Sequence, residues 1–239
     1  MMKITYIHHS SFLAELEHVY LLFDYFQGDI PVMEEDKPLI VFVSHRHGDH
    51  FSPAIFDIEK NHKKTEYIIS DDIWQNRVPQ ELHGKIQFVG PDEELNVDIW
   101  PGVEVQVETF KSTDEGVAFW VTTEGKNIYH AGDLNDWAWK GEDEKLNHQM
   151  TKRYQNELAK MKGRTCDVAF LPLDSRQEEW FFRGLDAFVK IVPTKHIFPM
   201  HVWEDFAVIG RLKAMECSAE YRDRVAEIRG CGDVFEVDL

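Results

Sequence analysis

A short segment that combines three histidines with an aspartate is the strongest chemical signal in the sequence. It runs Ser44-His45-Arg46-His47-Gly48-Asp49-His50. The chain has 12 histidines in 239 residues, so a six-residue window would hold about 0.3 of them by chance, whereas this one holds three. Imidazole nitrogens and carboxylate oxygens are ligands of borderline divalent cations such as zinc. The segment therefore predicts a site for one or two metal ions, with a solvated polar loop as the alternative.

Two residues much further along the chain end apolar segments in a similar way. Residues 128–133 read Ile-Tyr-His-Ala-Gly-Asp, and the glycine permits a sharp turn that directs Asp133 back over a sheet edge. Residues 197–201 read Ile-Phe-Pro-Met-His and end in His201. Taken alone, each is no more than a turn residue. Together with the histidine segment, Asp133 and His201 become candidate ligands.

The elements that must position these residues are strands in the first half and mixed strands and helices in the second. Apolar runs and alternation predict strands at 2–7, 11–16, 19–24, 39–43, 66–70, 86–89, 103–109, 117–122, 126–130, 167–171, 196–199 and 233–238. Helical spacing and capping predict helices at 53–60, 142–162, 178–191 and 204–215. The apolar run 39–43, just before the histidines, is typical of a strand buried on both faces. Two blocks of strands with helices on their outer faces predict a layered α/β sandwich.

Composition limits the class of protein. Hydrophobic residues make up 43% of the chain and charged residues 29%, and no apolar run reaches 18 residues, so neither disorder nor a membrane span is predicted. The length suits a single domain over 1–239. The N-terminus lacks the pattern of a secretory signal, and the three cysteines have no close pairing, which predicts a cytoplasmic protein.

Net charge limits the partners. A charge of −17 argues against nucleic acid, because the whole molecule would repel it. A small anionic substrate is compatible with this charge, because bound divalent cations reverse the potential locally. The sequence predicts no membrane partner, and it leaves a homo-oligomer open.

The order and separation of these motifs resemble the metallo-β-lactamase superfamily. The likeness rests on H-x-H-x-D-H at 45–50, the later strand with Gly-Asp, and the final strand-end histidine. The segments 9–12 (His-Ser-Ser-Phe) and 129–133 further resemble the branch that includes L-ascorbate-6-phosphate lactonase and other metal-dependent hydrolases. The resemblance implies a four-layer αβ/βα sandwich with the site at one edge of its two sheets.

The resemblance also implies a role for each candidate ligand. The expected ligands are His45 and His47 for a first metal ion, Asp49, His50 and His201 for a second, and Asp133 for both. Asp24, at the end of an early strand, would brace the histidine segment without binding metal. Metal-activated water would attack a carbonyl or phosphoryl centre, with Asp49, His50 and Asp133 as the catalytic residues.

One departure from the family pattern concerns the first metal ion. The superfamily usually supplies a third histidine after the strand at 103–109, yet no histidine occurs between His83 and His130. Lys111 lies most nearly at that position, where its ammonium would supply a positive charge near Asp133 or its amine would bind the metal, with an ordinary surface lysine as the alternative. We therefore expect one tightly bound ion, zinc before Mn2+, Ni2+ or Fe, and leave the second ion open.

Four further residues are candidates for supporting the site or the substrate. His9 is expected to hydrogen-bond near the metal, with direct ligation as the alternative. Trp137 either walls the substrate pocket or packs a helix onto the sheet. Arg176 and Arg183 would grip a substrate anion, with a solvated helix face as the alternative.

These features favour an enzyme that hydrolyses an ester, lactone or phosphoester in a small polar metabolite. A metal-binding sensor or interaction protein with a degenerate first site is the alternative. A phosphodiesterase or nuclease is the third possibility, for which the sequence offers no basic stripe. The complete second ligand set favours the enzyme.

Overall fold

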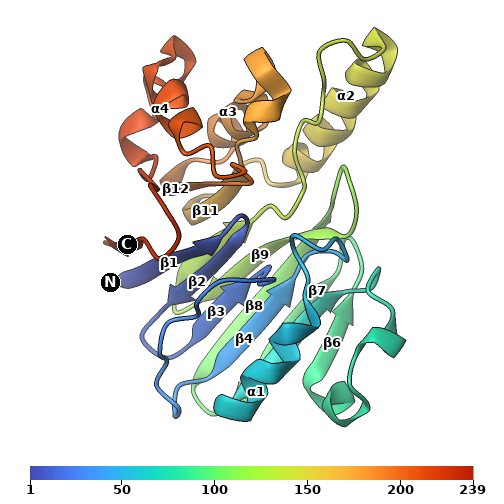
Figure 1. Cartoon of the computed structure of the whole chain (residues 1–239), viewed down its shortest axis with the longest axis vertical. Helices are drawn as coiled ribbons and strands as arrows, with labels where there is room; N and C mark the ends of the chain where they lie inside the picture. Colours follow the sequence, from blue (N-terminus) through green and yellow to red (C-terminus); the bar gives the residue numbers. More distant parts are fainter. Residues whose placement is uncertain (239) are drawn as a thin grey trace.

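The structure is built from two mixed β-sheets that pack face to face. It is a computed structural model that describes residues 1–238, apart from the side chains of residues 98 and 99. The first sheet has the order β13-β1-β2-β3-β4-β5-β6 and the second the order β12-β11-β10-β9-β8-β7 (Figure 1). The strands of the first sheet are β1 (Met2–His8), β2 (Ser11–Glu15), β3 (Tyr20–Phe23), β4 (Leu39–Val43), β5 (Thr65–Ser70), β6 (Ile86–Val89) and β13 (Val234–Val237). Those of the second are β7 (Glu94–Trp100), β8 (Val103–Lys111), β9 (Val117–Thr123), β10 (Lys126–His130), β11 (Cys166–Pro172) and β12 (Thr194–Met200).

Helices cover the outer face of each sheet. The helices are α1 (Ile58–Asn61), which continues the 3-10 turn Pro53–Asp57 over the first sheet, and α2 (Glu144–Lys160), α3 (Arg183–Ile191) and α4 (Ala207–Ala214) beside the second sheet (Figure 1). Ile55 packs into the cluster of side chains outside the first sheet, and Phe188 of α3 stacks on Tyr129 of β10 with ring centroids 4.6 Å apart. The layers run helix, sheet, sheet, helix, so the predicted four-layer αβ/βα sandwich is confirmed. No helix in the described part of the chain is long and apolar enough to cross a membrane.

Strand β4 shows how the apolar pattern sets the layers. Ile40 and Phe42 point into the core between the sheets, whereas Leu39, Val41 and Val43 point into the outer cluster under α1. All five are fully buried, as predicted for a strand covered on both faces. Because β3, β4 and β5 are parallel, the chain leaves β4 at the carboxyl edge of the sheet. The histidine segment starts at that edge.

Two predicted helices begin later than the sequence pattern suggests. The helix expected at 178–191 begins at Arg183, because Glu178 has a φ of +52° that interrupts the helical path. The helix expected at 204–215 begins at Ala207, after Trp203 and Glu204, whose φ angles are +49° and +60°. Left-handed backbone at a non-glycine residue is disfavoured, and apolar spacing carries no signal for it.

Strand β7 was not predicted as a separate element. It pairs antiparallel with β8 and has an irregular register between Val97 and Trp100.

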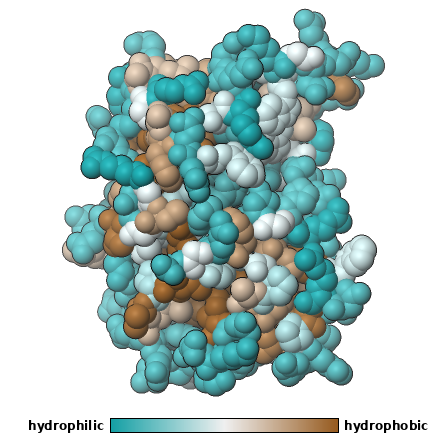
Figure 2. All heavy atoms as spheres, viewed as in Figure 1, coloured by the Kyte–Doolittle hydropathy of each residue, from teal (hydrophilic) through white to brown (hydrophobic). Residues whose placement is uncertain are grey.

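Hydrophilic side chains cover most of the face seen in Figure 2, in line with the net charge of −17. Hydrophobic side chains show through mainly in the lower half of that view, where the first sheet lies.

Candidate metal centre

The candidate ligands come together from loops at one edge of the two sheets. Parallel strands β10, β11 and β12 end at the same edge of the second sheet, as β4 does in the first. The contributing segments are the β1–β2 turn with His9, the loop after β4 with residues 45–50, the β8–β9 turn with Asp114, the loop after β10 with Asp133, and the loop after β12 with His201. Five connections from two sheets therefore converge on one place.

The ligand atoms form two groups, in each of which they lie within 4.8 Å of one another. One group is His45, His47, Asp114 and Asp133, and the other is His9, Asp49, His50 and His201. Asp133 joins them, because its Oδ2 lies 3.5 Å from His45 Nε2 and its Oδ1 lies 3.3 Å from His50 Nε2. Two ligand atoms about 2.1 Å from one tetrahedral ion would lie roughly 3.4 Å apart. The spacing therefore suits a bridging carboxylate between two ions.

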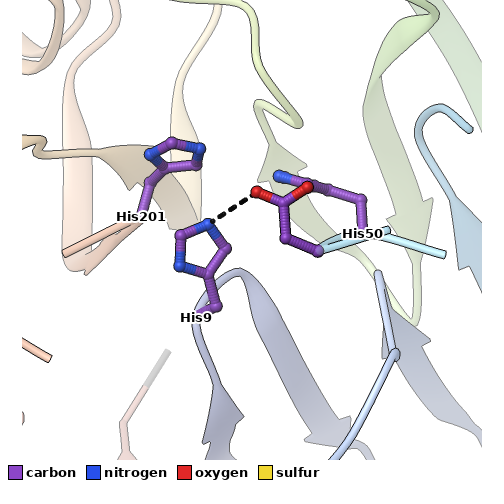
Figure 3. A group of neighbouring side chains, drawn as sticks. His9, His50 and His201 are labelled. Carbon is purple, nitrogen blue, oxygen red and sulfur yellow. Dashed lines mark ion pairs between the residues drawn. The ribbon is translucent and has the colours of Figure 1, made fainter. Parts of the chain in front are cut away.

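Buried polar atoms without hydrogen-bond partners converge on this place. They include the Nε2 atoms of His9, His45 and His50 and the Oδ1 atom of Asp133. Figure 3 shows the rings of His9, His50 and His201 arriving from three elements around a common space. Buried polar atoms without partners are uncommon and need an explanation. Divalent cations at the two groups would satisfy these four atoms, so the donor sets fit metal ions.

Asp24 fixes the orientation of the histidines from behind. It accepts hydrogen bonds from Ser44 N at 2.7 Å, from Ser44 Oγ at 2.6 Å and from His50 Nδ1 at 2.7 Å. Since the Ser44 hydroxyl donates to Asp24, its oxygen is left to accept from His45 Nδ1 at 2.9 Å. Both histidines then turn an unprotonated Nε2 toward the centre when metal is bound. Asp24 thus occupies the bracing position that the resemblance implied.

Two further residues support the candidate ligands and the turns that carry them. Asp174, after β11, lies 3.1 Å from His201 Nδ1 through its Oδ2. His130 lies 2.9 Å from the Ser10 carbonyl through Nε2 and accepts from Gly132 N–H at 3.1 Å through Nδ1. His130 therefore connects the turn that carries His9 to the turn that carries Asp133. The sequence signal for Asp174 was its place directly after an apolar strand, as for Asp133.

Burial and charge set the protonation of the group. Burial lowers the pKa of His45 to about 4, and burial also lowers the pKa of His9, so both are neutral at pH 7. Burial alone would lower the pKa of His50, but the carboxylates of Asp133 and Asp24 raise it well above its usual value. Burial alone would raise the pKa of Asp133, but His50 and the other histidines hold it well below its usual range. The centre contains anionic carboxylates before any metal binds.

Backbone conformation at the centre is unusual. His9, Asp24 and His201 have φ angles of +51°, +45° and +61°. Left-handed backbone costs free energy at residues other than glycine and persists where the surroundings enforce it. His9 and His201 are candidate ligands, one from each sheet, and Asp24 is the residue that braces the histidines. Strained backbone of this kind is typical of functional sites.

The structure corrects the prediction for Lys111. Strand β8 continues through Lys111, which pairs with Val117 of β9, and the lysine side chain is exposed and outside both ligand groups. Asp114, at the tip of the same hairpin, occupies the place beside His47, with 3.5 Å between its Oδ2 and His47 Nδ1. Gly116 permits this approach, because a Cβ there would lie 2.0 Å from the Ser44 carbonyl oxygen. A carboxylate had not been considered as the replacement for the missing histidine.

The structure also places His9 differently from the favoured expectation. Its side chain is 4% exposed, and Nε2 lies 3.5 Å from Asp49 Oδ2 (Figure 3). Its ring centroid lies 4.3 Å from that of His201. His9 therefore belongs to the second ligand group, which was the alternative considered for it.

A cleft of about 440 Å3 opens over the centre. Its lining combines metal-site residues with aromatic and apolar side chains: His47, Asp49, Asp114, Asp133, Trp137, Trp139, Glu142, Leu146, Asn147, Met150, Arg176, His201 and Trp203. Trp137 borders the cleft and also donates from Nε1 to the Asp133 carbonyl at 2.7 Å. A second hollow, about 640 Å3, lies beside the β9–β10 turn and contains none of the proposed ligands. Of these two hollows, the first is the one lined by candidate ligands.

The two arginine candidates have different positions. Arg176 lines the cleft, where its Nε donates to both oxygens of Asp174 at 2.9 and 3.0 Å and its guanidinium lies 4.4 Å from the Trp203 ring centroid. Arg183 instead pairs with Asp136 at 2.9 Å and does not line the cleft. The expectation for Arg183 is therefore wrong, because its charge is already used to hold the loop after β10.

The fold and the centre define a metallo-β-lactamase type of sandwich, and comparison with known proteins agrees. Residues 3–201 match the family model described as the beta-lactamase superfamily domain, so the chain belongs to this superfamily. It is 28% identical over 144 residues to a UPF0173 metal-dependent hydrolase of Opitutus terrae, a match that covers 55% of this chain and 63% of that protein. The chain spans less than two thirds of the length of such relatives.

Solved structures share the fold. Igni18, a metallo hydrolase from Ignicoccus hospitalis, superposes with a TM-score of 0.63 at 17% identity and covers 99% of both chains. The metallo-beta-lactamase fold protein YhfI from Bacillus subtilis superposes with a TM-score of 0.59 at 15% identity, over 98% of both chains. At these identities the likeness concerns the fold alone.

Proposed function

We propose that the protein is a metal-dependent hydrolase with two metal positions on either side of Asp133. The first position is formed by His45, His47, Asp114 and Asp133, and the second by His9, Asp49, His50, His201 and Asp133. The observation that carries the proposal is the convergence of buried, unpartnered ligand atoms from both sheets. With Asp114 in the first group, neither position lacks a ligand, which weakens the alternative of a degenerate metal-binding sensor.

The cleft residues supply the rest of the chemistry. Bound divalent ions would polarise the scissile carbonyl or phosphoryl group and lower the pKa of a coordinated water. Partial burial would raise the pKa of Asp49, but the contact with His9 and the charge of His50 hold it well below its usual range. Asp49 is therefore ionised at neutral pH and able to orient water by accepting its hydrogen bond. Its side chain, 29% exposed, faces the cleft from which substrate would enter.

The substrate class that fits best is a small anionic ester, lactone or phosphoester. A cleft of about 440 Å3 has the size of a small-molecule site. Among its described lining residues, Arg176 is the one arginine or lysine, and the contact with Asp174 raises its pKa, so it stays charged. Its guanidinium keeps donors free for a carboxylate or phosphate of the substrate. The resemblance of segments 9–12 and 129–133 to the branch that includes L-ascorbate-6-phosphate lactonase supports this class.

The donor sets favour zinc, with a different preference at each position. The second position offers three imidazoles, which suit zinc. The first offers two imidazoles and two carboxylates, and carboxylate oxygens also suit Mn2+ or Fe. We propose zinc at the second position, and zinc, Mn2+ or Fe at the first.

A panel of chromogenic substrates tests this function. The metal-loaded protein is offered p-nitrophenyl acetate, p-nitrophenyl phosphate, bis-p-nitrophenyl phosphate and a γ-lactone. We expect turnover of at least one small substrate, its loss with chelator and its return on adding metal. Asp133→Ala should lower the rate by more than about a thousandfold, since it removes a ligand shared by both ions. Asp36→Ala, at a fully exposed aspartate that does not line the cleft, should leave the rate unchanged.

The same panel, with a single-stranded oligonucleotide added to it, can refute the proposal. Full activity in Asp133→Ala would show that the candidate metal centre takes no part in the reaction. Cleavage of single-stranded nucleic acid with no turnover of the small substrates would favour a nuclease instead.

A further inference from the structure

The cleft has an acidic, metal-binding floor but apolar walls. Trp137 and Trp139 line it with nearly parallel rings, 8° apart in plane, and Leu146 of α2 lines it as well. Trp203 also lines the cleft and lies beside His9 and His201, with ring centroids 4.5 and 5.5 Å away. A cleft for a wholly polar metabolite would not need this much apolar wall.

Two of the wall residues are exposed to solvent. Leu146 is 57% exposed and Trp203 is 45% exposed, although both are large and apolar. Exposed apolar side chains that gather at one hollow commonly mark a binding surface. Packing of the core does not explain either side chain, because much of each lies in solvent. Trp137 differs, since its hydrogen bond to the Asp133 carbonyl also gives it a structural role.

Trp203 is held in place at a cost. Its φ of +49° and that of Glu204, +60°, lie in the left-handed region. This backbone directs the indole over the centre, where Arg176 covers it at 4.4 Å. Arg176 is itself held by Asp174, which also contacts His201. A flat apolar surface and a cation are thereby fixed side by side, next to the proposed second metal position.

We propose that the cleft selects substrates in which a flat aromatic ring lies next to the anionic or scissile group. The ring lies between Trp203 and the wall of Trp139 and Leu146, while Arg176 and the centre hold the anionic group. Aromatic rings stack well on tryptophan, and the ring is removed from water in the cleft. This inference rests on the proposed function and names the substrate class for the same site.

Binding of two matched phosphonates tests the inference without any turnover. Phenylphosphonate and methylphosphonate carry the same anionic group and differ in the ring. We measure their dissociation constants for the zinc-loaded protein by isothermal titration calorimetry. Phenylphosphonate should bind at least about tenfold more tightly. Trp203→Ala should weaken phenylphosphonate about fivefold or more and methylphosphonate less than about twofold, and Trp203→Phe should restore most of the preference.

Two more variants complete the test. Leu146→Ala removes an apolar side chain of the cleft that belongs to neither ligand group, and should also reduce the preference for the phenyl compound. Trp74→Ala removes a tryptophan that is 66% exposed and outside the cleft, and should change neither constant. Metal content is measured for each variant, so that the loss of a bound ion is not mistaken for the loss of an apolar contact with the phosphonate.

The outcomes separate the two proposals. Equal affinity for the two phosphonates, or an equal effect of Trp203→Ala on both, overturns the ring preference and leaves the hydrolase in place. Binding of neither compound also overturns it. The proposed hydrolase function would be refuted by different measurements, namely an absence of bound metal or an activity that does not change in Asp133→Ala.

Discussion

Asp133 is the residue that joins the two groups of candidate ligands. Its Oδ1 lies 3.3 Å from His50 Nε2 and 3.5 Å from His201 Nε2, while its Oδ2 lies 3.5 Å from His45 Nε2. Each oxygen therefore faces a different ligand group. A carboxylate with this geometry would offset part of the charge of an ion held by either group.

Asp114 should be required for the first metal ion. We expect Asp114→Ala to reduce metal content from two ions per chain toward one, because it removes one of four ligands and leaves the second group intact. Loss of a direct ligand should lower the affinity for that ion by more than about a hundredfold, since the loss of a residue that only supports a ligand already lowers metal affinity by about tenfold to a hundredfold. Elemental analysis after gel filtration measures the content.

Lys111→Ala is the control for that experiment. Its side chain is exposed and outside both ligand groups, so we expect the wild-type metal content. A reduced metal content in Lys111→Ala, with an unchanged content in Asp114→Ala, would mean that Lys111 and not Asp114 replaces the missing histidine.

Metal binding should release protons at neutral pH. The carboxylates of Asp133 and Asp24 raise the pKa of His50 well above its usual value, so His50 is protonated at pH 7 before metal binds. A metal ion needs the Nε2 lone pair and displaces that proton. Metal affinity should therefore rise with pH until the raised pKa of His50 is passed. Calorimetry in two buffers of different ionisation enthalpy should count about one proton released from this residue, and an affinity that is flat from pH 6 to pH 8 would contradict the prediction.

The β8–β9 hairpin supplies Asp114 to the first proposed metal position. It closes against the histidine segment, with a hydrogen bond of 2.9 Å from Val117 N to the Ser44 carbonyl. Gly116 has a φ of +66°, and a Cβ there would lie 2.6 Å from His45 Cβ. The glycine is therefore needed both for its backbone conformation and for the close approach.

Gly116→Ala should disrupt this contact. We expect it to lower the free energy of unfolding by about 3 kcal/mol or more, because the hairpin must move away from the Ser44 carbonyl. Gly125→Ala is the matched control, since Gly125 has a φ of +70° but open space around it. It should cost only about 1 kcal/mol, from backbone strain alone. Urea unfolding of both variants compares them, and equal losses would mean that the close approach is unimportant.

The sequence predicted the strands well and the final approach of the loops poorly. The run 39–43 marked β4 with correct bounds, because a strand buried on both faces leaves a continuous apolar pattern. The same pattern contains no information on where a hairpin tip lies relative to another sheet. The position of Asp114 depends on the register of Lys111 with Val117 and on Gly116, which only the packed structure determines. His9 and Asp174 were underestimated for the same reason.

At the level of the whole molecule, the centre connects the two sheets. His9 and the histidine segment belong to the first sheet, whereas Asp133 and His201 follow strands of the second. Bound ions would act as cross-links between them, and their removal leaves clustered carboxylates and buried, unpartnered ligand atoms. The fold should therefore depend on the metal for part of its stability.

Metal removal should lower the melting temperature and metal addition should restore it. An ion present at about a thousand times its dissociation constant contributes about 4 kcal/mol. For a chain of this length that corresponds to roughly 10 °C per site. Differential scanning calorimetry with and without chelator measures the change. A melting temperature that is the same in both conditions would mean that the folded protein holds no ion tightly.

Anomalous diffraction from crystals of the zinc-loaded protein tests the central claim most directly, because it locates the ions themselves. We predict two peaks on opposite sides of the Asp133 carboxylate. One should be ligated by His45, His47 and Asp114, and the other by His9, Asp49, His50 and His201. No peak beside Asp133, or peaks ligated by other residues, would contradict the account.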